Sequence, residues 1–272
     1  MFPVVVEPVA HAWQAGFANL QRGLAITRRQ PDLYVSLWLL YGLPTLVAAC
    51  VVVFGPSDGA WVQPLVFGLP WITIVVAPVV LMQAVAATLD GERLTFFEAT
   101  RRGVPSVPIY LWTNVHTTVL FWIPVGALVL LREYSPLGPV VPGAGWLALI
   151  GIVAVHQHVR TVLAPYLAVH GDLSGTHAAL TSWQLGGTYF WRLLGTFTVG
   201  SAPVALPLGL AFVLLARFGP NELSRALLAA SLQLGWVGIQ SIRPLLVPAL
   251  HTVYEDISQE TSLTRLRTGH IV

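Results

Sequence analysis

Six apolar runs, each long enough to cross the hydrocarbon core of a membrane, constrain this chain more than any other feature. They lie at Leu33–Phe54, Leu65–Leu89, Pro108–Leu131, Trp146–Val169, Tyr189–Ala216 and Leu227–His251. A membrane-spanning helix needs about 20 apolar residues, and the prolines inside the runs are tolerated because neighbouring helices satisfy the freed backbone groups. The sequence therefore predicts an all-α integral membrane protein with about six transmembrane helices.

The composition agrees with a membrane class and excludes others. Hydrophobic residues make up 55% of the chain and charged residues only 10%, whereas soluble domains carry about 25% charged residues. The net charge of +2 comes without a basic patch interleaved with aromatic residues, so we expect no nucleic-acid partner. The single cysteine, Cys50, cannot form an internal disulfide or a cysteine metal cluster, and we expect it to be a small buried residue. No metal site is predicted.

The arginines predict the orientation and the domain limits. With six spans, both termini share one side of the membrane, and that side carries eight of the fourteen arginines against three on the other. The positive-inside rule therefore makes both termini cytoplasmic. The predicted organisation is a cytoplasmic amphipathic lead-in at 1–32, a six-span domain at 33–251 and a cytoplasmic tail at 252–272.

The order of features along the chain predicts three degenerate copies of one helical hairpin. Each copy has an amphipathic lead-in helix, an outgoing span and a returning span followed by an aspartate: Asp90, Asp172 or Asp256. The three lead-ins are Phe17–Gly23, Phe97–Gly103 and Leu180–Gly186, each with a large apolar residue six positions before a glycine. Internal repeats of this kind indicate one structural unit used several times.

The lead-in segments have the pattern of helices at a membrane interface. In the first, Trp13, Phe17, Leu20 and Leu24 fall on one helical face, with glutamines and arginines elsewhere. In the second, Thr95 and Glu98 fit a capping box, so we expect a helix to begin there. An alternative is that the lead-ins form a cytoplasmic cap packed on the bundle, and both interpretations can hold together.

Two intramembrane arginines each stand five residues before a proline, Arg160 before Pro165 and Arg243 before Pro248. A charge inside a span costs roughly 2.5–3.5 kcal/mol on insertion scales, and the predicted spans contain no carboxylate. These arginines can therefore reach toward the interface, bind freed backbone carbonyls, or hold an anion such as a lipid phosphate. Counted along the helices, both lie roughly 12–14 Å from the cytoplasmic boundary.

Other polar residues lie near the same predicted depth, and we place them with the arginines in a candidate anion- or lipid-binding site. The proposed members are Arg160, Arg243, His116, His156, Gln240 and Asn114. If a site exists, it is expected between the third, fourth and sixth spans. The alternative is that these residues hydrogen-bond between helices and have only a structural role.

The intramembrane histidines suggest a second kind of site. His116, His156 and His158 lie on adjacent spans, and paired axial histidines could ligate a haem or a chlorin. The spacing is not diagnostic, so no cofactor is predicted as the main interpretation. Catalysis is not expected either, because the chain has no zincin motif, no phosphate-binding glycine loop and no nucleophile elbow.

The segment Pro248-Ala-Leu-His-Thr-Val-Tyr254-Glu-Asp256 resembles the last span of a group of bacterial membrane proteins. These are the glycerophosphoryl diester phosphodiesterase membrane-domain and YciC-like families, whose six-span layout with amphipathic lead-ins is also similar. The usual basic run after Tyr-x-Asp is replaced here by Ile257–Ser262. The resemblance implies an integral membrane accessory domain in the bacterial inner (cytoplasmic) membrane, and it does not imply phosphodiesterase activity.

The function expected from the sequence is that of a non-enzymatic inner-membrane protein. It would associate with membrane lipids, in particular anionic ones, or with other subunits of a membrane complex. One alternative is a transporter or permease component for an anionic or amphiphilic substrate, because repeated hairpins and broken helices suit transport. A second alternative is a haem- or pigment-binding membrane subunit.

Overall fold

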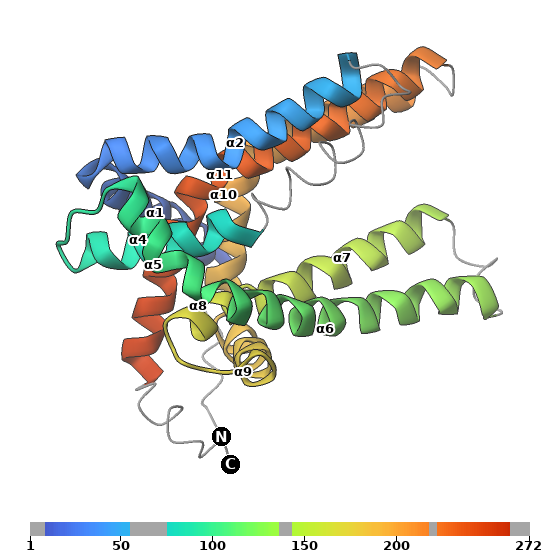
Figure 1. The fold of residues 1–272 in the computed structure, drawn as a ribbon. Helices are drawn as coiled ribbons and strands as arrows, with labels where there is room; N and C mark the ends of the chain where they lie inside the picture. The colour runs from blue at the N-terminus through green and yellow to red at the C-terminus, as the bar shows by residue number, and fades with distance from the viewer. Residues whose placement is uncertain (1–8, 55–74, 136–142, 218–221, 262–272) are drawn as a thin grey trace.

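The computed structural model describes residues 9–54, 75–135, 143–217 and 222–261, and this part of the chain is helical throughout apart from short turns (Figure 1). No strand occurs among these residues, so the all-α prediction is confirmed. The helices are α1 (Val9–Arg29), α2 (Pro31–Phe54), α4 (Ala77–Leu89), α5 (Phe96–Gly103), the 3-10 turn η2 (Val104–Ser106), α6 (Val107–Tyr134), α7 (Gly143–Thr161), α8 (Ala164–Val169), α9 (Gly175–Thr188), α10 (Phe190–Arg217) and α11 (Glu222–Thr261).

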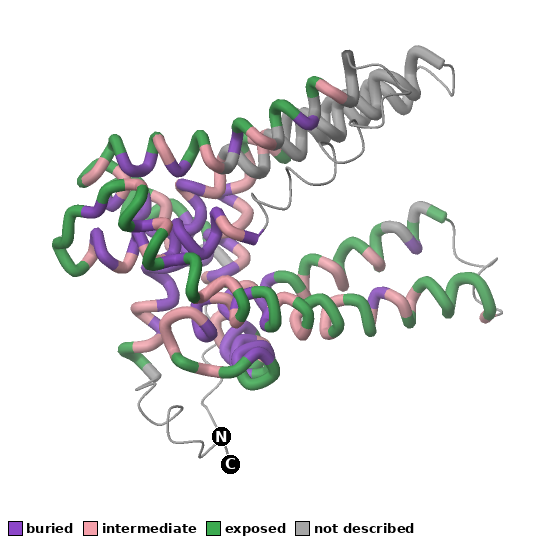
Figure 2. Tube along the Cα trace, in the orientation of Figure 1, coloured by how far each residue is buried: buried purple, intermediate pink, exposed green. Residues whose placement is uncertain are grey.

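The helices fall into a packed base and two diverging groups of long helices. The base consists of α1, α4, α5, α8, α9 and the last part of α11 from Pro244 to Thr261, and it holds most of the buried residues (Figure 2). From it, α6 and α7 run side by side in one direction and form the α6–α7 arm, while α2, α10 and α11 run in another (Figure 1).

The observed helices add detail to two expected boundaries. The predicted span Trp146–Val169 corresponds to a stretch that is helical except for a turn: α7 ends at Thr161 and α8 begins at Ala164, directly before Pro165, which cannot donate a backbone hydrogen bond. The predicted tail at 252–272 does not begin at a helix end, because α11 continues to Thr261. A further expectation, that Cys50 is buried, is wrong, because Cys50 is exposed on α2. The second predicted span is described only in part, because residues 65–74 lie outside the described residues.

By length and composition, two helical stretches within the described ranges could cross a membrane, Phe96–Tyr134 and Ala148–Val169. The first contains α6, whose buried residues are Tyr110, Thr113 and Val125. Large apolar side chains such as Trp122 and Ile123 are exposed on it. A helix of this apolar character with so little of it covered by protein is suited to a lipid environment.

Two lead-in glycines bring their helices into backbone contact with a helix of the preceding hairpin. A Cβ atom added at Gly103 of α5 would lie 2.8 Å from the Cα of Val80 on α4. A Cβ atom added at Gly186 of α9 would lie 2.5 Å from the Cα of Arg160 on α7. Both distances are shorter than real Cβ contacts, so only glycine fits at these positions.

The first lead-in helix makes the same kind of contact with the last helix. A Cβ atom at Gly23 of α1 would lie 2.8 Å from the backbone nitrogen of Ala249 on α11. Beside this contact, Arg22 pairs with Asp256 at 2.8 Å. Lead-in helices α5, α9 and α1 therefore pack on α4, α7 and α11 respectively. Each lead-in helix contacts the hairpin before it, and the first contacts the last, so the three hairpins are linked in a ring.

Candidate functional site

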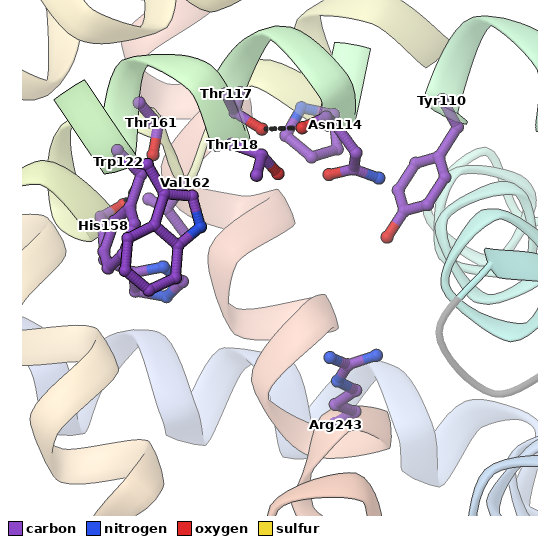
Figure 3. A pocket seen from close by; sticks show the side chains of 11 residues that line it. Tyr110, Asn114, Thr117, Thr118, Trp122, His158, Thr161, Val162 and Arg243 are labelled. Atoms are coloured by element: carbon purple, nitrogen blue, oxygen red, sulfur yellow. Dashed lines mark hydrogen bonds between the residues drawn. The ribbon is translucent and has the colours of Figure 1, made fainter. Parts of the chain in front are cut away.

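A cavity of about 370 Å³ lies where the α6–α7 arm and α11 part, and we call it the α6–α11 groove (Figure 3). It is formed by one side of α6, by the residues around the α7–α8 break and by α11. The residues that line it are Tyr110, Asn114, Thr117, Thr118, Phe121, Trp122, His158, Thr161, Val162, Pro165 and Arg243. The lining combines hydroxyl, amide and guanidinium groups with aromatic and aliphatic surface.

The α6 side of the groove is a polar stripe that the sequence interpretation missed except for one residue. Tyr110, Asn114, Thr117, Thr118 and Phe121 follow one another at helical spacing on a single face. The Thr117 hydroxyl donates a 3.0 Å hydrogen bond to the backbone oxygen of Asn114. The signal was present in the sequence, because a polar stripe with a helical period inside an apolar span favours a lined cavity or a helix interface.

Arg243 supplies the positive charge of the groove from the side opposite α6. Its guanidinium extends from α11 toward the stripe on α6 (Figure 3). It lies close enough to interact electrostatically with Tyr110 and His158. Among the described residues that line the groove, there is no carboxylate. An anion that enters the groove would therefore meet a cation together with several hydroxyl and amide donors.

Arg160, the second arginine predicted inside a span, lies outside this lining and packs against α9. Its Nε–H donates a 3.0 Å hydrogen bond to the backbone oxygen of Trp183, and its guanidinium carbon lies 3.4 Å from the centre of the Trp183 ring. The Ser182 hydroxyl donates to the Arg160 backbone oxygen at 3.0 Å. Arg160 thus joins α7 to α9, and the structure does not bring it together with Arg243 in one site.

The three histidines predicted inside spans have three different aromatic neighbours. His116 packs edge-on against Trp112 of the same helix, with ring centres 4.6 Å apart, and His156 lies 5.2 Å from the Phe190 ring. His158 lies 4.9 Å from the Phe197 ring and also lines the groove. The contacts of His156 and His158 pack α7 against α10. No two of these three histidines meet in a ring contact, and axial ligation of a haem or chlorin stays a prediction.

The other residues of the predicted anion- or lipid-binding site lie partly inside and partly outside the lining of the groove. Asn114 lines the groove on α6. His116 and His156 are outside the lining. Gln240 belongs to α11, three residues before Arg243, but its side chain lies outside the described residues. Of the predicted anion- or lipid-binding residues, Asn114 and Arg243 therefore line the same groove. His158, which was predicted only as a haem or chlorin ligand, lines it with them.

A cluster of ion pairs in the base was also missed from the sequence. The Asp256 carboxylate pairs with Arg22 of α1 and with Arg192 of α10, and Arg192 also lies 3.4 Å from Glu260. Arg192 is only 14% exposed, so its charge depends on these partners. The sequence placed Arg192 at a span edge and Asp256 in a tail, and no local pattern links residues so far apart.

A second buried cluster surrounds His170 and His251. Their rings meet edge-on with centres 5.0 Å apart, and Tyr254 and Tyr166 lie beside them. His170 Nε2 and His251 Nδ1 are buried without a hydrogen-bond partner within the described part of the chain. Burial, together with the nearby His251, lowers the pKa of His170 to about 4, so this imidazole is neutral at physiological pH.

The capping box expected at Thr95 is confirmed. The backbone N–H of Thr95 donates to the Glu98 carboxylate at 2.8 Å, and the backbone N–H of Glu98 donates to the Thr95 hydroxyl. α5 therefore begins where the sequence predicted.

Comparison with protein-family models, with curated proteins and with solved structures gives no match. Within the described residues, no group of three or more histidine, cysteine or acidic side chains could hold a metal ion. The interpretation of function therefore depends on the geometry of the site alone.

Proposed function

We propose that this chain is a non-enzymatic, six-span inner-membrane protein that binds an anionic amphiphile in the α6–α11 groove. The main candidate for this amphiphile is an anionic membrane lipid. The single observation that carries the proposal is Arg243, a cation that faces a stripe of hydroxyl and amide groups in a groove whose described lining has no carboxylate. Phosphate binds well to such a set, because an arginine can donate two parallel hydrogen bonds to it.

The membrane assignment is supported by the exposed surface of the α6–α7 arm. Exposed large apolar residues follow α6 over its length, among them Trp112, Val119, Trp122, Ile123 and Leu130. Water would be in contact with all of them if the arm projected into solution, and monomeric soluble proteins rarely expose apolar patches of this extent.

The proposed six spans are the three hairpins of the sequence repeat, with both termini cytoplasmic. Support comes from the repeated order of lead-in helix and long helix, and from the lead-in glycines that make equivalent close contacts. We also propose that the chain resembles the glycerophosphoryl diester phosphodiesterase membrane-domain and YciC-like families. Such a membrane protein could associate with a larger membrane complex.

The groove has the chemistry of an amphiphile site because both polar donors and apolar surface line it. Arg243, Asn114 and Tyr110 offer donors for a headgroup, whereas Phe121 and Trp122, about two to three turns along α6, offer apolar surface for an acyl chain. Arg160 takes no part, since its guanidinium is engaged by Trp183. The proposed site is thus narrower than the set of residues expected from the sequence.

The test is lipid retention by the purified protein. Native mass spectrometry of protein extracted in a mild detergent, with added phosphatidylglycerol, is expected to show bound lipid in the unmodified chain and at least a several-fold loss in Arg243→Gln. Arg132→Gln, which removes an exposed arginine near the end of α6, is the matched control and should retain the lipid. Equal retention in Arg243→Gln and Arg132→Gln would contradict the proposal.

A second candidate, transport of an anionic amphiphile, is favoured by one observation. Pro244 and Pro248 lie within α11, one and five residues after Arg243, and hydrophobic segments that carry prolines are common where transporters bind substrate. In liposomes that contain the protein, transport predicts flux of a labelled anionic amphiphile that Arg243→Gln abolishes. Lipid retention without flux would leave the binding function and exclude this one.

A further inference from the structure

The three lead-in helices leave their matched apolar residue uncovered. Phe17 of α1, Phe97 of α5 and Leu180 of α9 stand six positions before the glycine that packs each helix on its neighbour. They are 59%, 81% and 47% exposed. Six positions correspond to a rotation of about 120° around the helix, so the glycine faces the protein while the apolar residue points away from the contact.

α1 shows the same separation along its whole length. The side packed on α10 and α11 consists of small residues and one isoleucine: Ala12, Gly16, Asn19, Gly23 and Ile26 are buried. Trp13, Phe17 and Leu24, which fall on a neighbouring side, are exposed, whereas Leu20 on the same side is half-buried. Most of the apolar face is therefore not the face that packs α1 against α10 and α11.

Positive charges accompany the exposed apolar residues. Arg28 and Arg29 end α1, and Arg101 and Arg102 end α5, and all four are exposed. Arg102 pairs with Glu92, and the Glu98 carboxylate accepts hydrogen bonds in the capping box. Arg101 lies one turn after Phe97, and Arg28 lies one turn after the exposed Leu24. Apolar anchors with adjacent arginines match the boundary of a leaflet that contains anionic lipids.

The start of α9 adjoins the exposed apolar surface of the arm. A Cβ atom added at Gly175, the first residue of α9, would lie 2.5 Å from the Trp112 ring on α6. Trp112 and Leu111 are themselves exposed. The first turn of α9 thus meets the helix surface that the proposed function assigns to lipid, and Leu180 follows about one and a half turns later on the same helix.

We propose that Phe17, Phe97 and Leu180 form a three-point anchor that inserts into the headgroup–acyl boundary of the cytoplasmic leaflet, with Arg28, Arg29 and Arg101 against anionic headgroups. This anchor rests on the proposed membrane location of the chain, and it does not depend on lipid binding in the α6–α11 groove. It fixes the depth and the tilt of the base relative to the membrane at three positions.

The test measures the depth of single labels. Cys50 is the only cysteine, so Cys50→Ser gives a background in which Phe17→Cys, Phe97→Cys and Leu180→Cys can each carry an environment-sensitive fluorophore. Ala18→Cys, exposed about 100° away from Phe17 on α1, is the matched control, and Val119→Cys reports on α6. The protein is reconstituted in vesicles of phosphatidylcholine with phosphatidylglycerol. The labels are quenched by lipid spin-labelled at a shallow position, by lipid spin-labelled deep in the acyl chain, which tests the label at 119, or by aqueous iodide.

The anchor predicts that shallow lipid quenches the labels at 17, 97 and 180 at least twofold more than the label at 18, and that iodide shows the reverse order. Iodide access at 17, 97 and 180 equal to that at 18 would overturn it. The label at 119 separates the two proposals. Lipid quenching at 17, 97 and 180 but not at 119 would support the anchor and contradict the six-span assignment, and lipid quenching at none of the four would overturn both.

Discussion

The base and the α6–α7 arm are both helical but are stabilised in different ways. In the base, helices meet through glycines, a buried aromatic cluster and the Asp256 ion pairs. In the arm, α6 buries few of its residues and several glycines of α6 and α7 have open space around them. The base is organised by its own side chains, whereas the arm turns its apolar surface outward, where a lipid environment would cover it.

The largest expected difference concerns glycine. Gly186→Ala should destabilise the protein by about 3 kcal/mol or more, because overpacking against a backbone cannot be relieved by a side-chain movement, and the new Cβ would lie 2.5 Å from the Arg160 backbone. Gly151→Ala in the arm has nothing within 4 Å and should be neutral or slightly stabilising. Thermal unfolding in detergent measures both. Equal melting temperatures would break the comparison.

A smaller difference is expected for charge. Asp256→Asn leaves the mostly buried Arg192 with a weaker set of partners and should cost about 1–3 kcal/mol. The arm offers a matched change, Glu133→Gln, which removes the exposed pair with Arg132 at 3.9 Å and should stay within about 0.5 kcal/mol. Denaturation followed for each variant at the same ionic strength tests the pair. A large effect of Glu133→Gln would contradict the distinction.

The smallest expected difference is in the dependence on pH. Burial and the neighbouring His251 lower the pKa of His170 to about 4, against about 6.5 in an unfolded chain. Between these values the unfolded chain binds more protons, so the stability that neutral His170 contributes is present above pH 6.5 and is lost as the pH falls toward 4. Melting temperatures from pH 7.5 to 4.5 should fall less steeply in His170→Gln than in the unmodified chain. Equal slopes in the two proteins would contradict the contribution of neutral, buried His170.

The sequence predicted much of the helical framework because its signals are local. The run that predicts a span at Pro108–Leu131 corresponds to α6, and that at Tyr189–Ala216 corresponds to α10. The capping box at Thr95 placed the start of α5 correctly. The break before Pro165 was not predicted, because proline inside a membrane helix is often tolerated and only the surrounding helices decide whether it ends one.

The site was predicted only in part, because side-chain direction is not a local property. Arg160 and Arg243 have the same distance to a following proline, and that similarity suggested one shared site. Their environments differ because α9 lies against Arg160 and provides Trp183, whereas Arg243 faces the groove. The partners Arg22 and Asp256 are separated by most of the chain, and a single sequence holds no signal that pairs them.

The closed order of helix contacts has a consequence for biogenesis. α1 is made first, yet its partners α10 and α11 are made last. At about 5–20 residues per second, roughly 10–50 s separate the synthesis of α1 from that of the end of α11. During that interval the small-residue face of α1 has no partner, so a ribosome that stalls before α11 leaves an unfinished ring with an exposed first helix. Until α11 is in place, the uncovered face of α1 is accessible to quality-control proteases.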